Sequence, residues 1–153
     1  MNAKSGARER FELARNSLIE LSHRVHAYPE LGFEEEKASS WLCEALTEAG
    51  FSVEKGICDL PTAFLARAGS GPLNIGICAE YDCLPDIGHA CGHNIIAASA
   101  VGAAVAAAKV ADEVGLTVTV IGTRRGEEQD ADHRPRRSPP SGAGGVDHST
   151  PGG

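Results

Sequence analysis

The chain has 153 residues, a net charge of −7 at pH 7 and five cysteines. This length allows one domain with a buried core, and the acidic balance does not indicate a nucleic acid or an anionic membrane as partner. No apolar run is long enough to cross a bilayer, and the N-terminus is polar and lacks a signal-peptide core, so we expect a cytoplasmic protein. The five cysteines are odd in number and irregularly spaced, so we expect no disulfide framework.

Two amphipathic helices are predicted in the first fifty residues. Apolar residues at helical spacing predict a helix from about residue 9 to residue 27, which Pro29 ends. A second apolar stripe, from Ala38 to Ala49, predicts another helix with Gly50 just past its end. The acids at residues 34–36 suit the first turn of this helix through its dipole, and we interpret them as a solvated helix start rather than as catalytic groups.

Strands and one further helix follow. Short strands are predicted at residues 51–54, 63–68 and 73–79. The last of these is almost continuously apolar, as expected of a strand buried on both faces. A small-residue helix with Asn94 as its N-cap is predicted over 95–110, followed by a β-branched strand over 116–121. This strand, helix and strand form a βαβ unit with parallel strands.

The segment between the third strand and this helix carries the candidate chemistry. Cys91 and His93 stand two residues apart, with His89 just upstream, and thiol and imidazole groups are good ligands for a borderline-soft divalent metal. A helix turns residues at this spacing apart, so a loop or a strand end must present them. Two ligands do not complete a site, and a buried cysteine near a hydrogen-bonded histidine is also common packing, so the spacing alone leaves metal binding open.

Three acids are placed to approach this loop. Asp82 follows the third strand, and Glu127 and Glu128 follow the fourth. The carboxyl ends of parallel strands meet at one edge of a sheet, and open α/β sheets carry their sites there. We therefore expect these acids near the Cys/His loop, while the alternative that Glu127 and Glu128 are solvated acids stays open.

The composition changes abruptly after Thr123. Residues 124–153 contain no aromatic residue, and Val146 is their only aliphatic residue apart from alanine. Such a segment cannot bury enough apolar surface to offset its ordering entropy, so we predict a disordered tail behind a folded part formed by residues 1–123. Its mixed charge argues against nucleic-acid binding. We also hypothesise that a change of reading frame near residue 123 produced this segment.

Three motifs stand in a fixed order along the folded part. They are the segment Leu18–Phe33, the segment Glu80–Gly88 followed by His89–Asn94, and the strand end Ile121–Thr123. Together they resemble the motifs of metal-dependent N-acyl-amino-acid amidohydrolases, the aminoacylase and carboxypeptidase group called peptidase family M20. Asn94 and Ile96 look more like the dipeptidase-like amidohydrolase subgroup of this family.

The resemblance implies a fold, a cofactor and site residues. The implied fold is α/β, a partial three-layer αβα domain with a mostly parallel sheet that forms the N-terminal part of a metallopeptidase catalytic domain. Members of the family bind one or two divalent ions, usually Zn or Mn. By this resemblance Asp82 supports the site, Glu127 is the general base, and the metal ligands are Cys91, His93 and Glu128. The implied reaction is hydrolysis of an amide bond in N-acyl amino acids or small dipeptides.

The chain departs from the family pattern just after Thr123. The family reads Gly-Thr-Pro-Ala-Glu-Glu there, so an ungapped match puts Gly126 at the base position and Glu127 at the ligand position. One inserted residue restores Glu127 as base and Glu128 as ligand. The family chain also continues into a dimerisation domain, which makes full-length relatives homodimers, and into a second catalytic half with further histidine ligands. We therefore expect a truncated member of the family.

Three functions stay under consideration. The first is a metal-dependent amidohydrolase, and the alternative is a catalytically inactive fragment that retains part of a metal site. A thiol-redox protein using Cys78, Cys83 and Cys91 is the third, and the absence of a Cys-x-x-Cys sequence argues against it.

Overall fold

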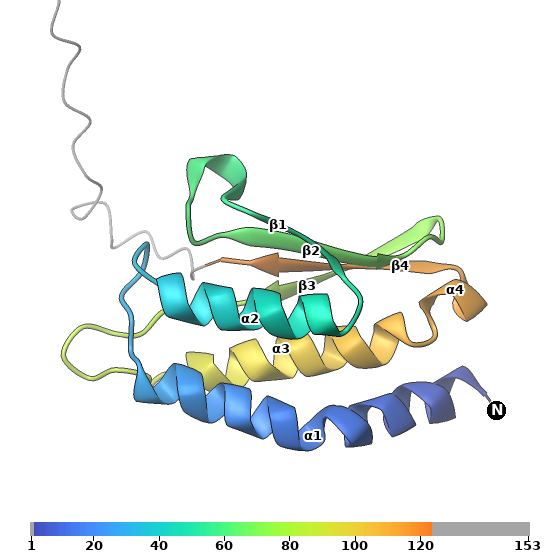
Figure 1. Cartoon of the computed structure of the whole chain (residues 1–153), viewed down its shortest axis with the longest axis horizontal. Helices are drawn as coiled ribbons and strands as arrows, with labels where there is room; N and C mark the ends of the chain where they lie inside the picture. Colours follow the sequence, from blue (N-terminus) through green and yellow to red (C-terminus); the bar gives the residue numbers. More distant parts are fainter. Residues whose placement is uncertain (1, 124–153) are drawn as a thin grey trace, which may run out of the picture.

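The computed structural model describes residues 2–123, and these form a mixed arrangement of helices and strands (Figure 1). The elements in chain order are α1 (Ala3–Ala27), α2 (Glu36–Glu48), β1 (Ser52–Lys55), the short 3-10 turn η1 (Ile57–Asp59), β2 (Phe64–Gly69), β3 (Leu73–Ala79), α3 (His93–Ala108), α4 (Ala111–Val114) and β4 (Leu116–Gly122). The predicted α/β class and all four predicted strands are confirmed. The prediction for residues 124–153 lies outside the described residues.

The four strands form one mixed sheet in the order β1-β2-β4-β3. β3 and β4 are parallel because helix α3 carries the chain back between them. β2 is antiparallel to both of its neighbours, and its connection to β1 is too short for a parallel crossover. Within residues 2–123 the sheet is therefore not mostly parallel, which differs from the prediction.

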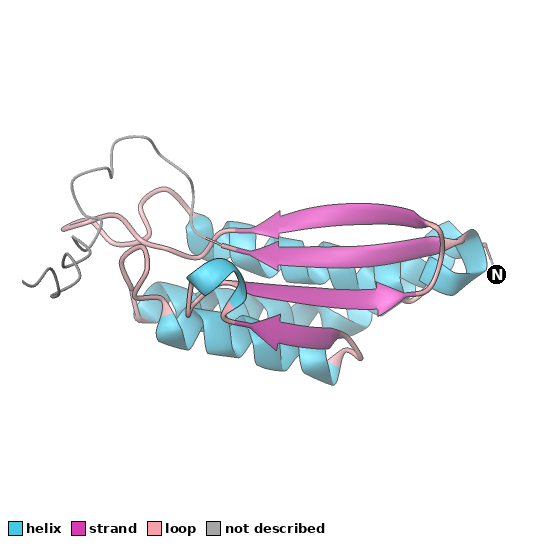
Figure 2. Cartoon of the chain, turned by 90° about the horizontal axis from the view of Figure 1, so that it is seen from above, coloured by secondary structure: helices cyan, strands magenta, loops and turns pink. Residues whose placement is uncertain are grey.

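The three long helices lie on the same side of the sheet (Figure 1), and the view of Figure 2 looks onto the strands with the helices behind them. The described residues thus form two layers where three were predicted. This arrangement also corrects the prediction that β3 is buried on both faces. β3 lies at the edge of the sheet, and its side chains Leu73 and Ile75 are 61% and 41% exposed. Its neighbour β4 is the buried strand, with Val118 and Val120 fully buried.

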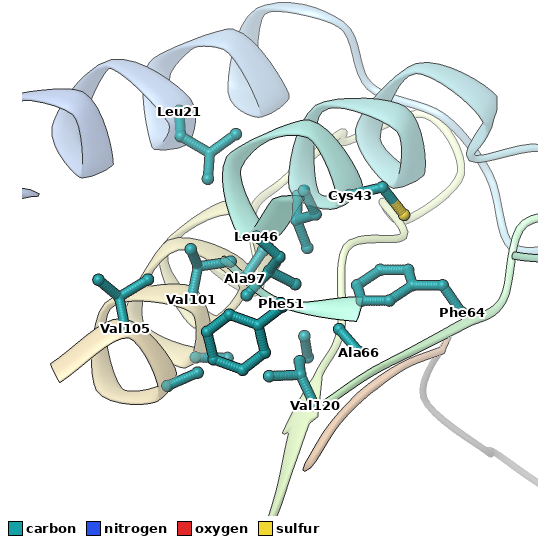
Figure 3. Packing of buried hydrophobic residues seen from close by; sticks show 14 of the residues in the cluster. Leu21, Cys43, Leu46, Phe51, Phe64, Ala66, Ala97, Val101, Val105 and Val120 are labelled. Atoms are coloured by element: carbon teal, nitrogen blue, oxygen red, sulfur yellow. The ribbon is translucent and has the colours of Figure 1, made fainter. Parts of the chain in front are cut away.

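The core lies between the sheet and the helices (Figure 3). Phe64 of β2, Leu42 and Leu46 of α2 and Val101 of α3 are at most 1% exposed. Helix α3 packs closely because its residues are small: a Cβ atom added at Gly102 would lie 2.8 Å from Leu18 Cδ1 of α1. The small residues of this helix are therefore required for its close packing, and its many alanines also favour the helical conformation.

Two predicted helix ends are wrong. Helix α1 begins at Ala3 rather than near residue 9, because the Asn2 side chain caps it by accepting the backbone N–H of Ser5 at 2.9 Å. Apolar periodicity could not locate this polar first part of the helix. Helix α3 begins at His93, so Asn94 lies in its first turn instead of capping it, and its side-chain amide donates to Ser22 Oγ at 2.9 Å. In the described part of the chain we find no helix with the length and apolar character to cross a membrane.

Candidate metal centre

The predicted site gathers where β3 ends and α3 begins. Glu80, Tyr81 and Asp82 directly follow β3, and His93 is the first residue of α3. The parallel pairing of β3 and β4 brings the ends of both strands together, and the Thr123 backbone N–H donates to the Ala79 carbonyl at 3.0 Å. The chain therefore leaves β4 beside this site.

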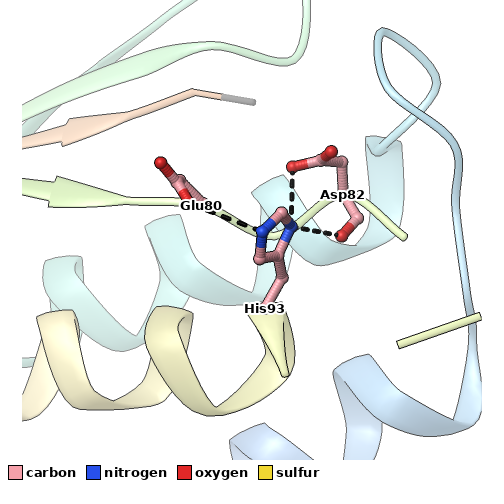
Figure 4. A network of polar contacts seen from close by, with 3 residues as sticks. All are labelled: Glu80, Asp82 and His93. Atoms are coloured by element: carbon pink, nitrogen blue, oxygen red, sulfur yellow. Dashed lines mark hydrogen bonds and ion pairs between the residues drawn. The ribbon is translucent and has the colours of Figure 1, made fainter. Parts of the chain in front are cut away.

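His93 is the centre of the site, and its two ring nitrogens face two different acids (Figure 4). Nδ1 lies 2.8 Å from the backbone carbonyl of Asp82 and 3.0 Å from its carboxylate Oδ1. Nε2 lies 3.4 Å from Oε2 of Glu80. Nδ1 thus has two acceptors within hydrogen-bond distance, and Nε2 is the ring nitrogen on the side of Glu80, away from Asp82, where a histidine supported at Nδ1 would bind a metal. A carboxylate that accepts from the far ring nitrogen is the usual support of a metal-bound histidine.

The loop before His93 places the remaining Cys/His groups. Cys91 is exposed, and Gly92 between it and His93 has a left-handed φ of 83°, so the turn that the motif requires is made by a glycine. His89 is buried, with its ring centroid 6.1 Å from that of the exposed His26. Burial, and then the neighbouring imidazoles of His26 and His93, lower the pKa of His89, which favours its neutral form.

Glu35 corrects the interpretation of the acids at the start of α2. It is 1% exposed rather than solvated, and its Oε2 accepts the Thr62 hydroxyl at 2.8 Å. The Tyr81 hydroxyl donates to the Thr62 backbone carbonyl at 2.6 Å. Tyr81 stands between Glu80 and Asp82, so this buried chain of contacts fixes the segment that holds His93. No local pattern in the sequence distinguishes Glu35 from its two exposed neighbours, because Thr62 and Tyr81 reach it from other elements.

The second anchor of the segment is Glu30. Its carboxylate accepts the backbone N–H groups of Lys37 at 3.1 Å and Ala38 at 2.9 Å, and its backbone carbonyl accepts the N–H of Cys83 at 2.8 Å. Glu30 thus joins the first turn of α2 to the loop that follows Asp82. The motif at residues 28–35 therefore supports the site, because its Glu30 holds this loop in place.

Burial of Glu35 has a consequence for stability. Desolvation is the largest effect and raises the pKa of this carboxyl above 4.5, while the backbone N–H groups of Glu35 and Phe33 and the Thr62 hydroxyl oppose it. The folded protein therefore holds this proton to a higher pH than the unfolded chain does. The stability linked to it is complete below the ordinary pKa and is lost as the pH rises through the raised pKa.

We expect Glu35→Gln to gain in unfolding free energy relative to the wild type as the pH rises above 4.5, because glutamine has no proton to lose. Urea denaturation followed by circular dichroism at several pH values measures this difference. The matched control is Glu34→Gln, which makes the same change of charge at an exposed position. A pH-independent difference for Glu35→Gln contradicts the prediction.

The donors present fit part of a metal centre. A thiol, an imidazole and carboxylates are the groups that bind zinc in proteins. Within residues 2–123, however, no three His, Cys, Asp or Glu side chains converge on one point, since Glu80 and Asp82 lie at opposite nitrogens of His93. Glu127 and Glu128, the predicted base and third ligand, lie outside the described residues, and their roles stay predictions.

Comparisons with known proteins place the chain among hydrolases. No family model matches it. It is 37% identical to mouse Xaa-Arg dipeptidase over 141 residues, which is 82% of this chain and 32% of the relative. It is 43% identical to the human Xaa-Arg dipeptidase over 100 residues, 56% of this chain and 22% of the relative. It is also 31% identical to one of the subunits of Escherichia coli p-aminobenzoyl-glutamate hydrolase over 126 residues, 71% of this chain and 26% of the relative.

Two solved structures share the fold. A protein described as an aminohydrolase from methicillin-resistant Staphylococcus aureus aligns with a TM-score of 0.64 at 25% identity, over 74% of this chain and 33% of that chain. A Bacillus subtilis protein described as a dinuclear metal-binding peptidase from the M20 family aligns with a TM-score of 0.58 at 24% identity, over 72% and 35%. The chain thus spans about a third or less of the length of the curated relatives it matches.

Proposed function

This chain belongs to peptidase family M20, and we propose that it supplies one part of a divalent-metal centre for hydrolysis of an amide bond in N-acyl amino acids or small dipeptides. The observation that supports this proposal most directly is His93, whose Nδ1 is held by Asp82 and whose Nε2 faces an open carboxylate. The names of the relatives, a dipeptidase and an aminobenzoyl-glutamate hydrolase, support the substrate class.

In this proposal the ion is Zn or Mn, with Cys91, His93 and Glu128 as its ligands in this chain. When bound, such an ion would supply Lewis acidity to the scissile carbonyl and to the attacking water. Asp82 accepts from His93 Nδ1 and so fixes the orientation of the imidazole. Glu127 takes the proton of the attacking water and returns it to the leaving amine.

A second candidate function is a chain that binds a metal without catalysing hydrolysis. One observation favours it: within the described residues no three donors converge. Both candidates predict metal uptake, and they differ only in turnover.

The test uses the full chain with added Zn²⁺ or Mn²⁺ and a panel of N-acyl amino acids and dipeptides, including dipeptides with a carboxy-terminal arginine. We expect release of free amino acid that requires the metal and stops when a chelator removes it. Cys91→Ala should abolish this release, while Cys58→Ala, which removes another exposed thiol, should not. Metal uptake without turnover favours the second candidate, and a chain that takes up no metal contradicts both.

A further inference from the structure

Strand β3 forms an open edge of the described sheet. The strand order β1-β2-β4-β3 gives β3 a single neighbour, β4, within residues 2–123. The Leu73 N–H donates to the Gly115 carbonyl at 3.4 Å. The Ala79 carbonyl accepts the Thr123 N–H at 3.0 Å. The odd-numbered residues of β3 therefore direct their backbone groups to β4, and the three even-numbered residues between them direct their N–H and C=O groups away from the sheet.

The two edges of this sheet differ in how they are protected against pairing. β1, at the opposite edge, is four residues long and carries Glu54 and Lys55. Short length and charged side chains are the usual protection of an edge strand. β3 is seven residues long and contains neither a charged residue nor a proline. The edge formed by β3 is therefore suited to accept a further strand.

An apolar row of side chains accompanies the β3 edge on the helix side of the sheet. The odd-numbered residues of β3 point to this side, since Ala79 belongs to the core and Ile77 packs against it. Leu73 and Ile75 belong to the same row but are 61% and 41% exposed, so the helices leave them uncovered. Helix α3, which contacts β3, contains no Asp, Glu, Lys or Arg, and its exposed residues are Ile95, Ile96, Ser99 and Ala103. The matching partner is a strand that also brings apolar side chains to the helix side.

A second copy of β3 meets these requirements when it pairs antiparallel to the first. With the two-fold axis at Gly76, all residues of the strand find a partner, and every outward N–H meets an outward carbonyl. Gly76 then lies opposite itself, and Ile75 lies opposite Ile77 of the second copy. The apolar rows of the two copies meet on the helix side, where cross-strand pairs of β-branched residues stabilise a sheet.

Charge favours this orientation over a parallel one. Glu80 and Asp82 follow β3 directly, so antiparallel pairing keeps the acids of the two copies at opposite ends of the joined strands. Parallel pairing would put the two Glu80 side chains next to each other, where like charges are unfavourable. The net charge of −7 makes two copies repel each other at low salt, and physiological salt screens this repulsion beyond about 8 Å.

We propose that β3 is an interface between two copies of this chain, in which the two strands pair antiparallel about Gly76 and join two four-stranded sheets into one. The contact is closed, because the same edge of each copy is used. It involves no metal and no residue of the candidate metal centre, so it stands or falls independently of the proposed function.

The experiment is sedimentation equilibrium of the full chain at about 0.15 M salt. We expect twice the chain mass of 15.9 kDa at high protein concentration, with dissociation on dilution. Gly76→Lys and Gly76→Glu each place two like charges opposite one another, and each should weaken dimerisation by at least about 10-fold. A Cβ atom added at Gly76 meets no atom within 4 Å, so the folded chain accommodates both changes.

An equimolar mixture of these two variants should regain the dimer, because lysine then lies opposite glutamate, and a misfolded variant would not recover in this way. Ser52→Lys puts the same charge on the exposed edge of β1 and should dimerise as the wild type does. A wild type that stays monomeric overturns the proposal, and so does a dimer that survives Gly76→Lys, since the interface then lies elsewhere. A mixture that stays monomeric contradicts the pairing about Gly76, and open-ended larger assemblies contradict a closed two-fold contact.

Discussion

Replacing Phe64 with alanine is expected to lower the free energy of unfolding by about 3–5 kcal/mol, a large share of the stability of an ordinary domain. Phe64 is fully buried on β2, and its ring stacks on Tyr81 with 6.0 Å between centroids and 12° between the planes. The Phe64 ring packs against Gly122 of β4, and any larger residue there would overlap the ring with its Cβ atom. The neighbouring strands cannot collapse fully into the cavity, so the penalty stays high.

Urea denaturation of the metal-free chain measures this loss as a shift of the midpoint at constant slope. Leu13→Ala is the matched control, because Leu13 is 73% exposed on α1 and its truncation should change stability by less than about 0.5 kcal/mol. Equal losses of unfolding free energy in the two variants would show that the Phe64 ring is not buried in the core. The same variant also removes the partner of Tyr81, so we expect it to loosen the segment that holds His93.

Local sequence patterns locate the elements of this fold but not their neighbours. The apolar stripe of α2 and the continuous apolar run of β3 both lie in the predicted elements. The order of the strands depends on which segments pair across the chain, and periodicity within one strand carries no such information. Leu73 and Ile75 illustrate this point, since the same apolar run would suit a central strand and here lies at an edge.

The candidate site shows the same limit of local sequence patterns. Cys91 and His93 stand out by residue type and spacing, and Asp82 by its place after a strand. The contacts of Glu35 and Glu80 could not be predicted, because each acid meets a residue of another segment: Thr62 for Glu35 and His93 for Glu80. A solvated acid and a buried one have the same local sequence, and only the tertiary contact decides between them.

His93→Ala is expected to weaken Zn²⁺ binding by more than about 100-fold, beyond what the loss of an outer partner costs. The variant removes the one nitrogen that faces Glu80 and leaves the carboxylates of Glu80 and Asp82 without the ring that separates them. Asp82→Asn keeps the imidazole but replaces the carboxylate that orients it, so its loss should be smaller, about 10- to 100-fold.

The order of these effects tests the arrangement around the imidazole. Competition with a chromophoric chelator gives the Zn²⁺ affinities of the wild type, His93→Ala and Asp82→Asn. The control His23→Ala removes an exposed histidine of α1 and should bind Zn²⁺ as the wild type does. If Asp82→Asn costs as much as His93→Ala, Asp82 binds the ion itself and Nδ1 is the metal-binding nitrogen. If His93→Ala binds Zn²⁺ like the wild type, the ion is held elsewhere. The expected order, with His93 first and Asp82 second, follows only if the ring lies between the ion and its supporting acid.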